Sequence, residues 1–430
     1  MGGTPAATAV RALLVWDMPP RPSSRGIWLL ALIAVAVAIF SAVGAASLWR
    51  NAPFSDFSNI QTGAQCLVSG CDPYDSQALN AEAARRHEAK GEIWQMSPVY
   101  PPSALILVLP YEALPWPLAA HLFDLTGGLL AAICAGLMLW HFRIRLWDPA
   151  AIILLALVAG EAVLGALEYA NPALLEAGLA ALGCFVLLER RSHHWIGWGS
   201  LGLALALKPQ LALGVLVVLL LRPETRTAAA KACGFALLLL LLGLLSYRLR
   251  LGSFHYLETL HQAFSLSIAP LASSDFTSNF SFDFLNIQTS LATIHHLGRR
   301  SINALAWLTA AALAVIASIL ARRSGALQRH PWTMIALGQI ISLLPIYHRG
   351  YDRVVALLLI PAAVELARTR RYIAWLYAAV VAFWLTNEKV WTHVLTRLRF
   401  QPLNPVIEIA FIAVLLASLW SVTKSSSIKE

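Results

Sequence analysis

Long apolar runs alternate with polar segments along most of the chain. The first run, Ile27–Leu48, contains 22 residues, enough for a helix to cross a hydrocarbon core of about 30 Å at about 1.5 Å per residue. The polar stretch Arg50–Ser97 follows, and the next full-length run is Pro117–Trp140. Between them, Pro102–Pro115 is apolar but short and bounded by prolines, so we expect a re-entrant or interfacial piece there. The pattern predicts an all-α, polytopic transmembrane helix bundle.

Ten further apolar runs continue this alternation. They are Ala150–Leu167, Pro172–Leu188, Trp195–Leu207, Gln210–Leu221, Ala228–Tyr247, Ile302–Ala321, Trp332–Ile346, Val354–Leu366, Ile373–Leu385 and Val406–Val422. Together with the first two runs they predict about 12 crossings, with a range of about 10 to 13.

Basic clusters recur where this alternation places cytoplasmic loops, as the positive-inside rule requires. They are Arg190 with Arg191, Arg222 with Arg226 and Lys231, Arg322 with Arg323, Arg368 with Arg370 and Arg371, and Lys424 with Lys429. We therefore expect a multi-pass protein of the cell inner or plasma membrane, with cytoplasmic tails over 1–26 and 423–430 and a membrane domain over 27–422. Extracytoplasmic loops are expected at about 50–98, 248–301 and 347–353, and the functional site should lie on their side.

Composition supports the membrane interpretation. Hydrophobic residues make up 58% of the chain and charged residues only 13%, whereas a soluble domain carries about 25% charged residues. A soluble enzyme is therefore excluded as the main interpretation. The net charge of +9 is explained by basic cytoplasmic loops, so we expect no nucleic-acid partner. The five cysteines include no CxxC pair, which argues against a zinc site.

Lys208 is the clearest case of a charged residue within an apolar run. It lies between two apolar stretches in the string ALALKPQLALG, and Pro209 breaks the helix there because proline lacks an N–H donor. A broken helix at membrane depth is tolerated where it lines a cavity, and an ammonium in that cavity would attract an anion such as a lipid phosphate. The alternative is a lysine that snorkels from a helix end. The neighbouring Gln210 favours a binding role.

Asp56 follows the first run by only a few residues and should lie near the membrane surface. A carboxylate there can act as a general base or bind a cation. The alternatives are an ordinary loop aspartate or the N-cap of a helix that begins near Phe57.

The late connection Pro345–Val355 contains four ionisable residues between two apolar runs. They are His348, Arg349, Asp352 and Arg353. Such a group could handle a phosphate or transfer protons, although short loops are polar in any case.

A turn is expected after Gly70, followed by a polar helix over Gln77–Lys90. Asp72 and Asp75 have turn chemistry, and we favour that role over a metal pair. Cys66 and Cys71 flank the turn and could form a disulfide if their geometry allows.

Three acids near the third and fourth runs, Glu161, Glu168 and Glu176, resemble the carboxylates of proton relays. They support an alternative function, a secondary transporter or flippase for lipid-linked sugars. The chain contains no Walker A, GxGxxG, GxSxG or HExxH motif, so nucleotide-driven transport, dinucleotide chemistry and the familiar hydrolases lack their signatures.

Over roughly Ser55–Leu366 the chain resembles the family 87 glycosyltransferases, membrane enzymes of the GT-C type. The resemblance rests on an acid just after the first span, the G-x-D-P-Y string Gly70–Tyr74, the Y-P-P string Tyr100–Pro102 and the K-P-Q break at Lys208–Gln210. The chain departs from the family where Tyr169–Pro172 replaces a common Gly-Gln pair, which leaves the sugar and acceptor open.

The resemblance implies transfer of a hexose, with mannose as the family's default, from a polyprenyl-phosphate donor to a lipid or glycan acceptor on the extracytoplasmic face. Membrane lipids would surround the site, and a single donor phosphate requires no metal or other cofactor because protein cations can balance its charge. We therefore predict Asp56 as the general base. The predicted donor-phosphate residues are Lys208, Gln210, His348, Arg349 and Arg353, and the predicted substrate-lining residues are Tyr74, Tyr100, Asn171 and Asp352. A related polymerase or ligase for lipid-linked oligosaccharides would share this donor and topology.

Overall fold

The fold was determined from a computed structural model, which describes residues 55–85, 100–190, 193–252, 258, 299–345, 350–385, 410 and 412–417. These residues form helices joined by turns and include no β-strand. The expected first span, both tails and most of the last run lie outside the described residues. The all-α prediction is confirmed for the described part.

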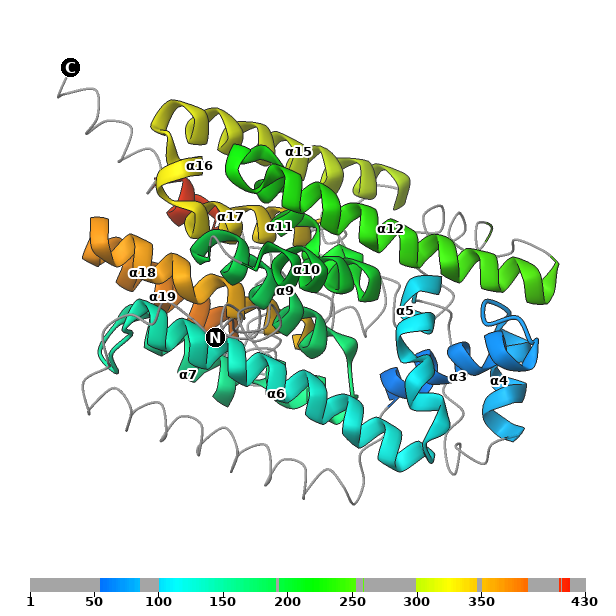
Figure 1. The fold of residues 1–430 in the computed structure, drawn as a ribbon. Coiled ribbons are helices and arrows are strands. Elements are labelled where there is room, and N and C mark those ends of the chain that lie inside the picture. The colour runs from blue at the N-terminus through cyan, green and yellow to red at the C-terminus, as the bar shows by residue number, and fades with distance from the viewer. Residues whose placement is uncertain are drawn as a thin grey trace, which may run out of the picture.

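The helices are joined by short connections over most of this part (Figure 1). They are α3 (Ser55–Ser69), α4 (Ser76–Arg85), α5 (Pro102–Val108), η1 (Leu109–Ala113), α6 (Trp116–Phe142), α7 (Pro149–Ala159), α8 (Glu161–Glu168), α9 (Pro172–Glu189), α10 (His194–Leu207), α11 (Pro209–Leu221), α12 (Pro223–Leu251), α15 (Arg299–Ser324), α16 (Ala326–Arg329), α17 (Pro331–Leu343), η4 (Gly350–Leu359), α18 (Ile360–Thr369) and α19 (Arg371–Leu385).

Proline begins many of these helices, because its missing N–H and fixed φ suit the first helical position. The helices that begin at a proline are α5, α7, α9, α11, α12 and α17. At the α10–α11 and α11–α12 junctions a single residue separates the two helices, and proline is the first residue of the second helix.

Five helical stretches among the described residues are long and apolar enough to cross a membrane, judged by length and composition. They are Leu118–Phe142, Pro149–Glu168, Pro172–Glu189, Pro223–Leu251 and Ser301–Ser324. Several others, including α11, α17 and α19, are apolar but shorter. The protein is thus a helical membrane protein, while the number of about 12 crossings stays a prediction.

Two expected runs are divided in the structure. The run Ala150–Leu167 is interrupted at Gly160, which separates α7 from α8. A Cβ atom at Gly160 would lie 2.6 Å from the carbonyl oxygens of Ala156 and Leu385, so only glycine allows α19 to approach this closely. The run Val354–Leu366 begins within the 3₁₀ helix η4 and becomes α-helical only at Ile360. Pro102–Pro115 contains the short helices α5 and η1, and its re-entrant or interfacial placement stays a prediction.

A polar network fastens one end of the bundle. Glu189 at the end of α9 accepts a hydrogen bond from the indole of Trp332 (2.8 Å), and its other oxygen lies 2.9 Å from His141 Nε2. Glu365 on α18 accepts the backbone N–H groups of Trp332 and Thr333, which begin α17. The ends of α6, α9, α17 and α18 are therefore held together.

The opposite end carries α3, α4 and α5, which gather beside the C-terminal half of α12 (Figure 1). Ser103 on α5 donates a buried hydrogen bond of 2.6 Å to the carbonyl of Ala206, two residues before the α10–α11 break. This contact fixes α5 against the helix break at Lys208.

Candidate active site

The start of α3 is anchored to the end of α8. The backbone N–H groups of Asp56 and Phe57 both donate to the carbonyl of Tyr169, at 3.1 and 3.4 Å. The Phe57 ring is fully buried and lies 5.5 Å from the Trp116 ring and 4.8 Å from the Phe123 ring. Asp56 thus lies in the first turn of α3, which is held by the backbone bonds to Tyr169 and by the packing of the Phe57 ring. The helix N-terminus favours the negative charge of Asp56.

Asn171 connects this helix to the bundle. Ala170 has a left-handed backbone (φ 46°), and this turn places Asn171 at the N-cap of α9, ahead of Pro172. The Asn171 side-chain oxygen accepts the N–H of Ala173 (2.8 Å), the usual N-cap bond. Its amide nitrogen donates to Asp56 Oδ2 at 2.6 Å. The cap and the acid partner together define which way the amide points.

Lys208 sits at the break between α10 and α11, as the sequence predicts. It ends α10 and caps α11, with Pro209 as the first residue of α11. Its Nζ donates to Asn171 Oδ1 at 3.2 Å and forms a short ion pair with Asp352. Lys208 is only 6% exposed and Asp352 3%, so this pair is nearly free of solvent screening.

One amide therefore joins the predicted base to the predicted phosphate-binding cation. Asn171 donates to Asp56 and accepts from Lys208, although the three residues come from α3, the α8–α9 turn and the α10–α11 break. Within the described part of the chain, the second oxygen of Asp56 makes no hydrogen bond. An acceptor hydroxyl could donate to that oxygen while an anion binds beside Lys208.

η4 supplies two further charges. The sequence predicts Asp352 and Arg353 in a short polar connection, but both are buried and lie on this 3₁₀ helix. The Arg353 guanidinium lies 5.8 Å from the Trp384 ring centroid, a cation–π distance. Asp352 is the ion-pair partner of Lys208, a contact that its predicted substrate-lining role did not include.

The remaining predicted site residues are Gln210, Tyr74, Tyr100, His348 and Arg349. Gln210 is half-buried in the first turn of α11. Tyr74 and Tyr100 are buried in the cluster around Phe57, and the Tyr74 hydroxyl donates to the Tyr100 carbonyl at 3.0 Å. Their substrate-lining role stays a prediction. His348 and Arg349 lie outside the described residues.

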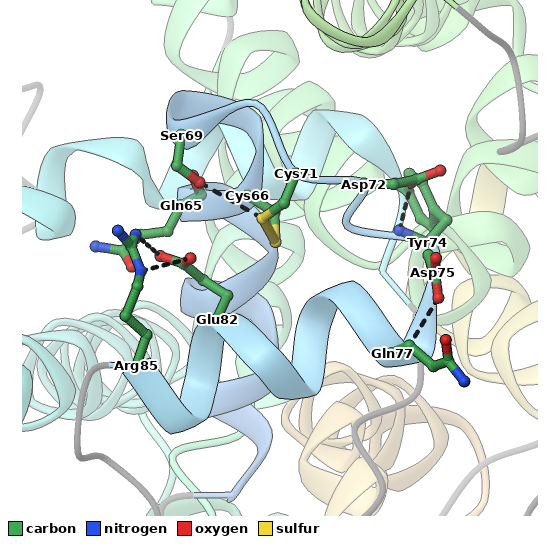
Figure 2. The surroundings of a disulfide bond; sticks show 10 residues. All are labelled: Gln65, Cys66, Ser69, Cys71, Asp72, Tyr74, Asp75, Gln77, Glu82 and Arg85. Atoms are coloured by element: carbon green, nitrogen blue, oxygen red, sulfur yellow. Dashed lines mark hydrogen bonds and ion pairs between the residues drawn. A yellow bond between two sulfur atoms is a disulfide. The ribbon is translucent and has the colours of Figure 1, made fainter.

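Cys66 and Cys71 form a disulfide that closes the turn after α3, with 4.4 Å between their Cα atoms (Figure 2). Gly70 within this turn has a φ of 85°, which glycine adopts without a steric penalty. Asp72 Oδ1 accepts the N–H of Tyr74 (2.8 Å), and Asp75 Oδ1 accepts the N–H of Gln77 (2.8 Å) at the start of α4. These bonds fit the turn role that sequence analysis favoured.

Tyr247 links this turn to the bundle, a contact that no pattern in the sequence indicated. Its hydroxyl on α12 donates to Asp72 Oδ2 at 2.9 Å, and its ring lies 5.7 Å from the Tyr74 ring in an edge-to-face arrangement. Arg250, one turn further along α12, donates to the Val68 carbonyl at 3.2 Å. The far end of α3 is therefore held by α12, while its start is held by Tyr169.

We expect Tyr247→Phe to lower the unfolding free energy by about 1–3 kcal/mol, because a hydrogen bond to a charged acceptor is lost while the buried ring is retained. Thermal unfolding in detergent would measure this. The matched control is Tyr372→Phe on α19. Its hydroxyl accepts an exposed hydrogen bond from Arg370 at 3.3 Å, and loss of such a solvent-exposed bond should leave the melting temperature nearly unchanged. Equal melting temperatures for Tyr247→Phe and the unaltered protein would show that the Tyr247–Asp72 bond does not stabilise the fold.

The profile described as Glycosyltransferase family 87 matches residues 99–345, more than half of the chain. This stretch contains Asn171, Glu176 and Lys208, whereas Asp56 and Asp352 lie outside it.

Two curated relatives, from two strains of Mycobacterium tuberculosis, are each described as an alpha-(1->3)-arabinofuranosyltransferase. Each is 32% identical to this chain over 143 residues, which cover 31% of this chain and 31% of the relative. The chain thus matches about a third of the length of these relatives. No solved structure shows significant similarity.

Proposed function

Because the chain belongs to glycosyltransferase family 87, we propose that it transfers a sugar from a polyprenyl-phosphate donor to a hydroxyl group of a lipid or glycan on the extracytoplasmic side of the membrane. Asp56 acts as the general base and Lys208 binds the donor phosphate. The reaction requires no divalent metal, because protein cations balance the charge of a single phosphate.

The observation that carries this proposal is the Asp56–Asn171–Lys208 arrangement. Glycosyl transfer requires a base for the acceptor hydroxyl and a cation for the departing phosphate. Here a carboxylate and an ammonium are each hydrogen-bonded to the same buried amide, at 2.6 and 3.2 Å. Both groups are therefore positioned before substrate binds, and they are close enough to act on the two sides of one sugar.

The chemical step can be assigned to these residues. The acceptor oxygen forms a bond to the anomeric carbon while its proton passes to Asp56. The bond between that carbon and the phosphate oxygen breaks, and the electron pair leaves with the polyprenyl phosphate. The ammonium of Lys208 stabilises the charge that develops on this leaving group.

Two sugars are candidates for the group that is transferred. The family resemblance favours mannose, a hexose. The relatives described as arabinofuranosyltransferases favour a pentofuranose as the second candidate. Both donors would present the same phosphate to Lys208, so the described residues support the two candidates equally.

A transfer assay in nanodiscs tests the proposal. The purified protein would receive radiolabelled polyprenyl-phosphate mannose, arabinofuranose or glucose in separate reactions, with a membrane lipid and glycan extract as acceptor. We expect label in a new product with one of these donors and without added metal. Absence of product with every donor, while the donors remain intact, would contradict the proposed donor class. A requirement for a divalent metal would contradict the charge argument.

A further inference from the structure

Glu176 is a buried acid that the proposed mechanism does not use. It lies on α9, five residues after Asn171, and its side chain is 0% exposed. Neither carboxyl oxygen has a hydrogen-bond partner in the described structure. Such a group is rare in folded proteins and requires an explanation.

The surroundings of Glu176 contain the charges of the candidate active site. α9 packs against α10, α11 and η4, and this places the Glu176 carboxyl within electrostatic range of Lys208 on the α10–α11 break and of Asp352 on η4. The thiol of Cys184 on the same helix also lies within electrostatic range. Asp352 already neutralises Lys208 through an ion pair. A carboxylate here is costly because it is fully buried, has no hydrogen-bond partner among the described residues and lies near the Asp352 carboxylate.

Donor binding would disturb this arrangement. The donor phosphate must approach the Lys208 ammonium, which is engaged by Asp352. As Lys208 turns toward the phosphate, its ion pair with Asp352 weakens at the moment when another anion arrives nearby. A neutral carboxylic acid has an O–H donor, and two neighbouring carboxyl groups can share one proton. Glu176 has the chemistry to replace Lys208 as a donor to Asp352.

We propose that Glu176 is a positioning residue for donor binding, which donates its O–H to Asp352 when Lys208 binds the donor phosphate. This inference rests on the proposed function, because it assumes a phosphate-bearing donor at Lys208. It assigns Glu176 a role as a neutral hydrogen-bond donor, in contrast to the proton relay that the acids of this region suggested.

Two substitutions separate this role from a structural one. Glu176→Gln keeps the volume and a donor, because its amide N–H can bind Asp352. Glu176→Leu keeps a similar volume but removes the donor. We expect Glu176→Gln to retain a donor KM within about 3-fold of the unaltered enzyme. We expect Glu176→Leu to raise the donor KM by about 10- to 100-fold with a smaller change in kcat, as for loss of a hydrogen bond to a charged group.

Thermal unfolding provides the readout that excludes a folding defect. Because Glu176→Leu replaces an unpaired buried carboxyl with an apolar group, it should be at least as stable as the unaltered protein. A variant that is more stable but binds donor more weakly cannot be explained by misfolding. An unchanged donor KM in Glu176→Leu would overturn the inference, and so would equal impairment of the Gln and Leu variants.

Binding of polyprenyl monophosphate, measured directly in nanodiscs, distinguishes failure of this inference from failure of the proposed function. This probe carries the phosphate but no sugar. Weaker binding by Glu176→Leu than by Glu176→Gln supports the inference even if no sugar from the panel is transferred. Equal binding by the three proteins overturns it, although transfer by the unaltered enzyme would leave the proposed function intact. No binding by the unaltered protein would overturn both.

Discussion

Asp56→Asn is expected to lower kcat by about 10²- to 10⁴-fold, the usual contribution of a general base. Asparagine has nearly the same shape, and its side-chain oxygen can still accept the Asn171 amide that now binds Asp56 Oδ2. The backbone bonds from residues 56 and 57 to the Tyr169 carbonyl do not involve the side chain. The substitution therefore removes proton acceptance with little change in position. Single-turnover transfer at saturating donor would measure it.

The matched control for this prediction is Asp75→Asn. Asp75 lies on the same α3–α4 segment, but its side chain is exposed and accepts the Gln77 N–H at the start of α4. An asparagine oxygen can make the same cap, so transfer should stay at the unaltered rate. If Asp56→Asn turned over as fast as Asp75→Asn, Asp56 would not be the base.

Lys208→Met is expected to have two separable effects. It removes the cation that balances the leaving phosphate, so kcat/KM for the donor should fall by about 10²- to 10³-fold. It also leaves Asp352 buried without its ammonium partner. Removal of one member of a buried pair typically destabilises a protein by about 3–5 kcal/mol, so a loss of activity in this variant alone could reflect unfolding.

The double variant Lys208→Met with Asp352→Asn separates the two effects. Neutralising Asp352 removes the uncompensated charge, so thermal stability should return toward that of the unaltered protein. Transfer should not return, because no ammonium faces the phosphate. Measurement of the melting temperature and of donor kcat/KM on all three proteins tests this. Recovery of both quantities in the double variant would show that Lys208 only balances Asp352.

The sequence indicated the features that depend on interactions between neighbouring residues, namely helix lengths, one helix break and helix ends. The apolar runs predict helices in a membrane because their length matches the hydrocarbon core, and five described stretches have that length and composition. The break at Lys208 follows from Pro209, which has no N–H to continue a helix. The end of α3 follows from Gly70, and the start of α4 from the capping oxygen of Asp75. Each of these features depends on neighbours a few residues away.

The disulfide and the role of Asn171 depended on packing. Cys66 and Cys71 were a possible pair in the sequence, but only the folded turn places their Cα atoms 4.4 Å apart. Asn171 was predicted only as a substrate-lining residue. Its bonds to Asp56 and Lys208 join residues 115 and 37 positions away, and no periodicity in the chain encodes such distances.

Glu176 shows most clearly which information came from the sequence and which from the tertiary structure. The sequence shows an acid within an apolar run, and such a residue in a membrane helix is a reasonable functional candidate. The sequence could not show which charges it would face, because the side chains of Lys208 and Asp352 come from two other elements. By itself, the sequence determined the all-α class, the helix break at Lys208 and the kinds of chemical groups available. The tertiary structure decided which groups meet, because hydrogen bonds and ion pairs act over a few ångströms between segments far apart in the chain.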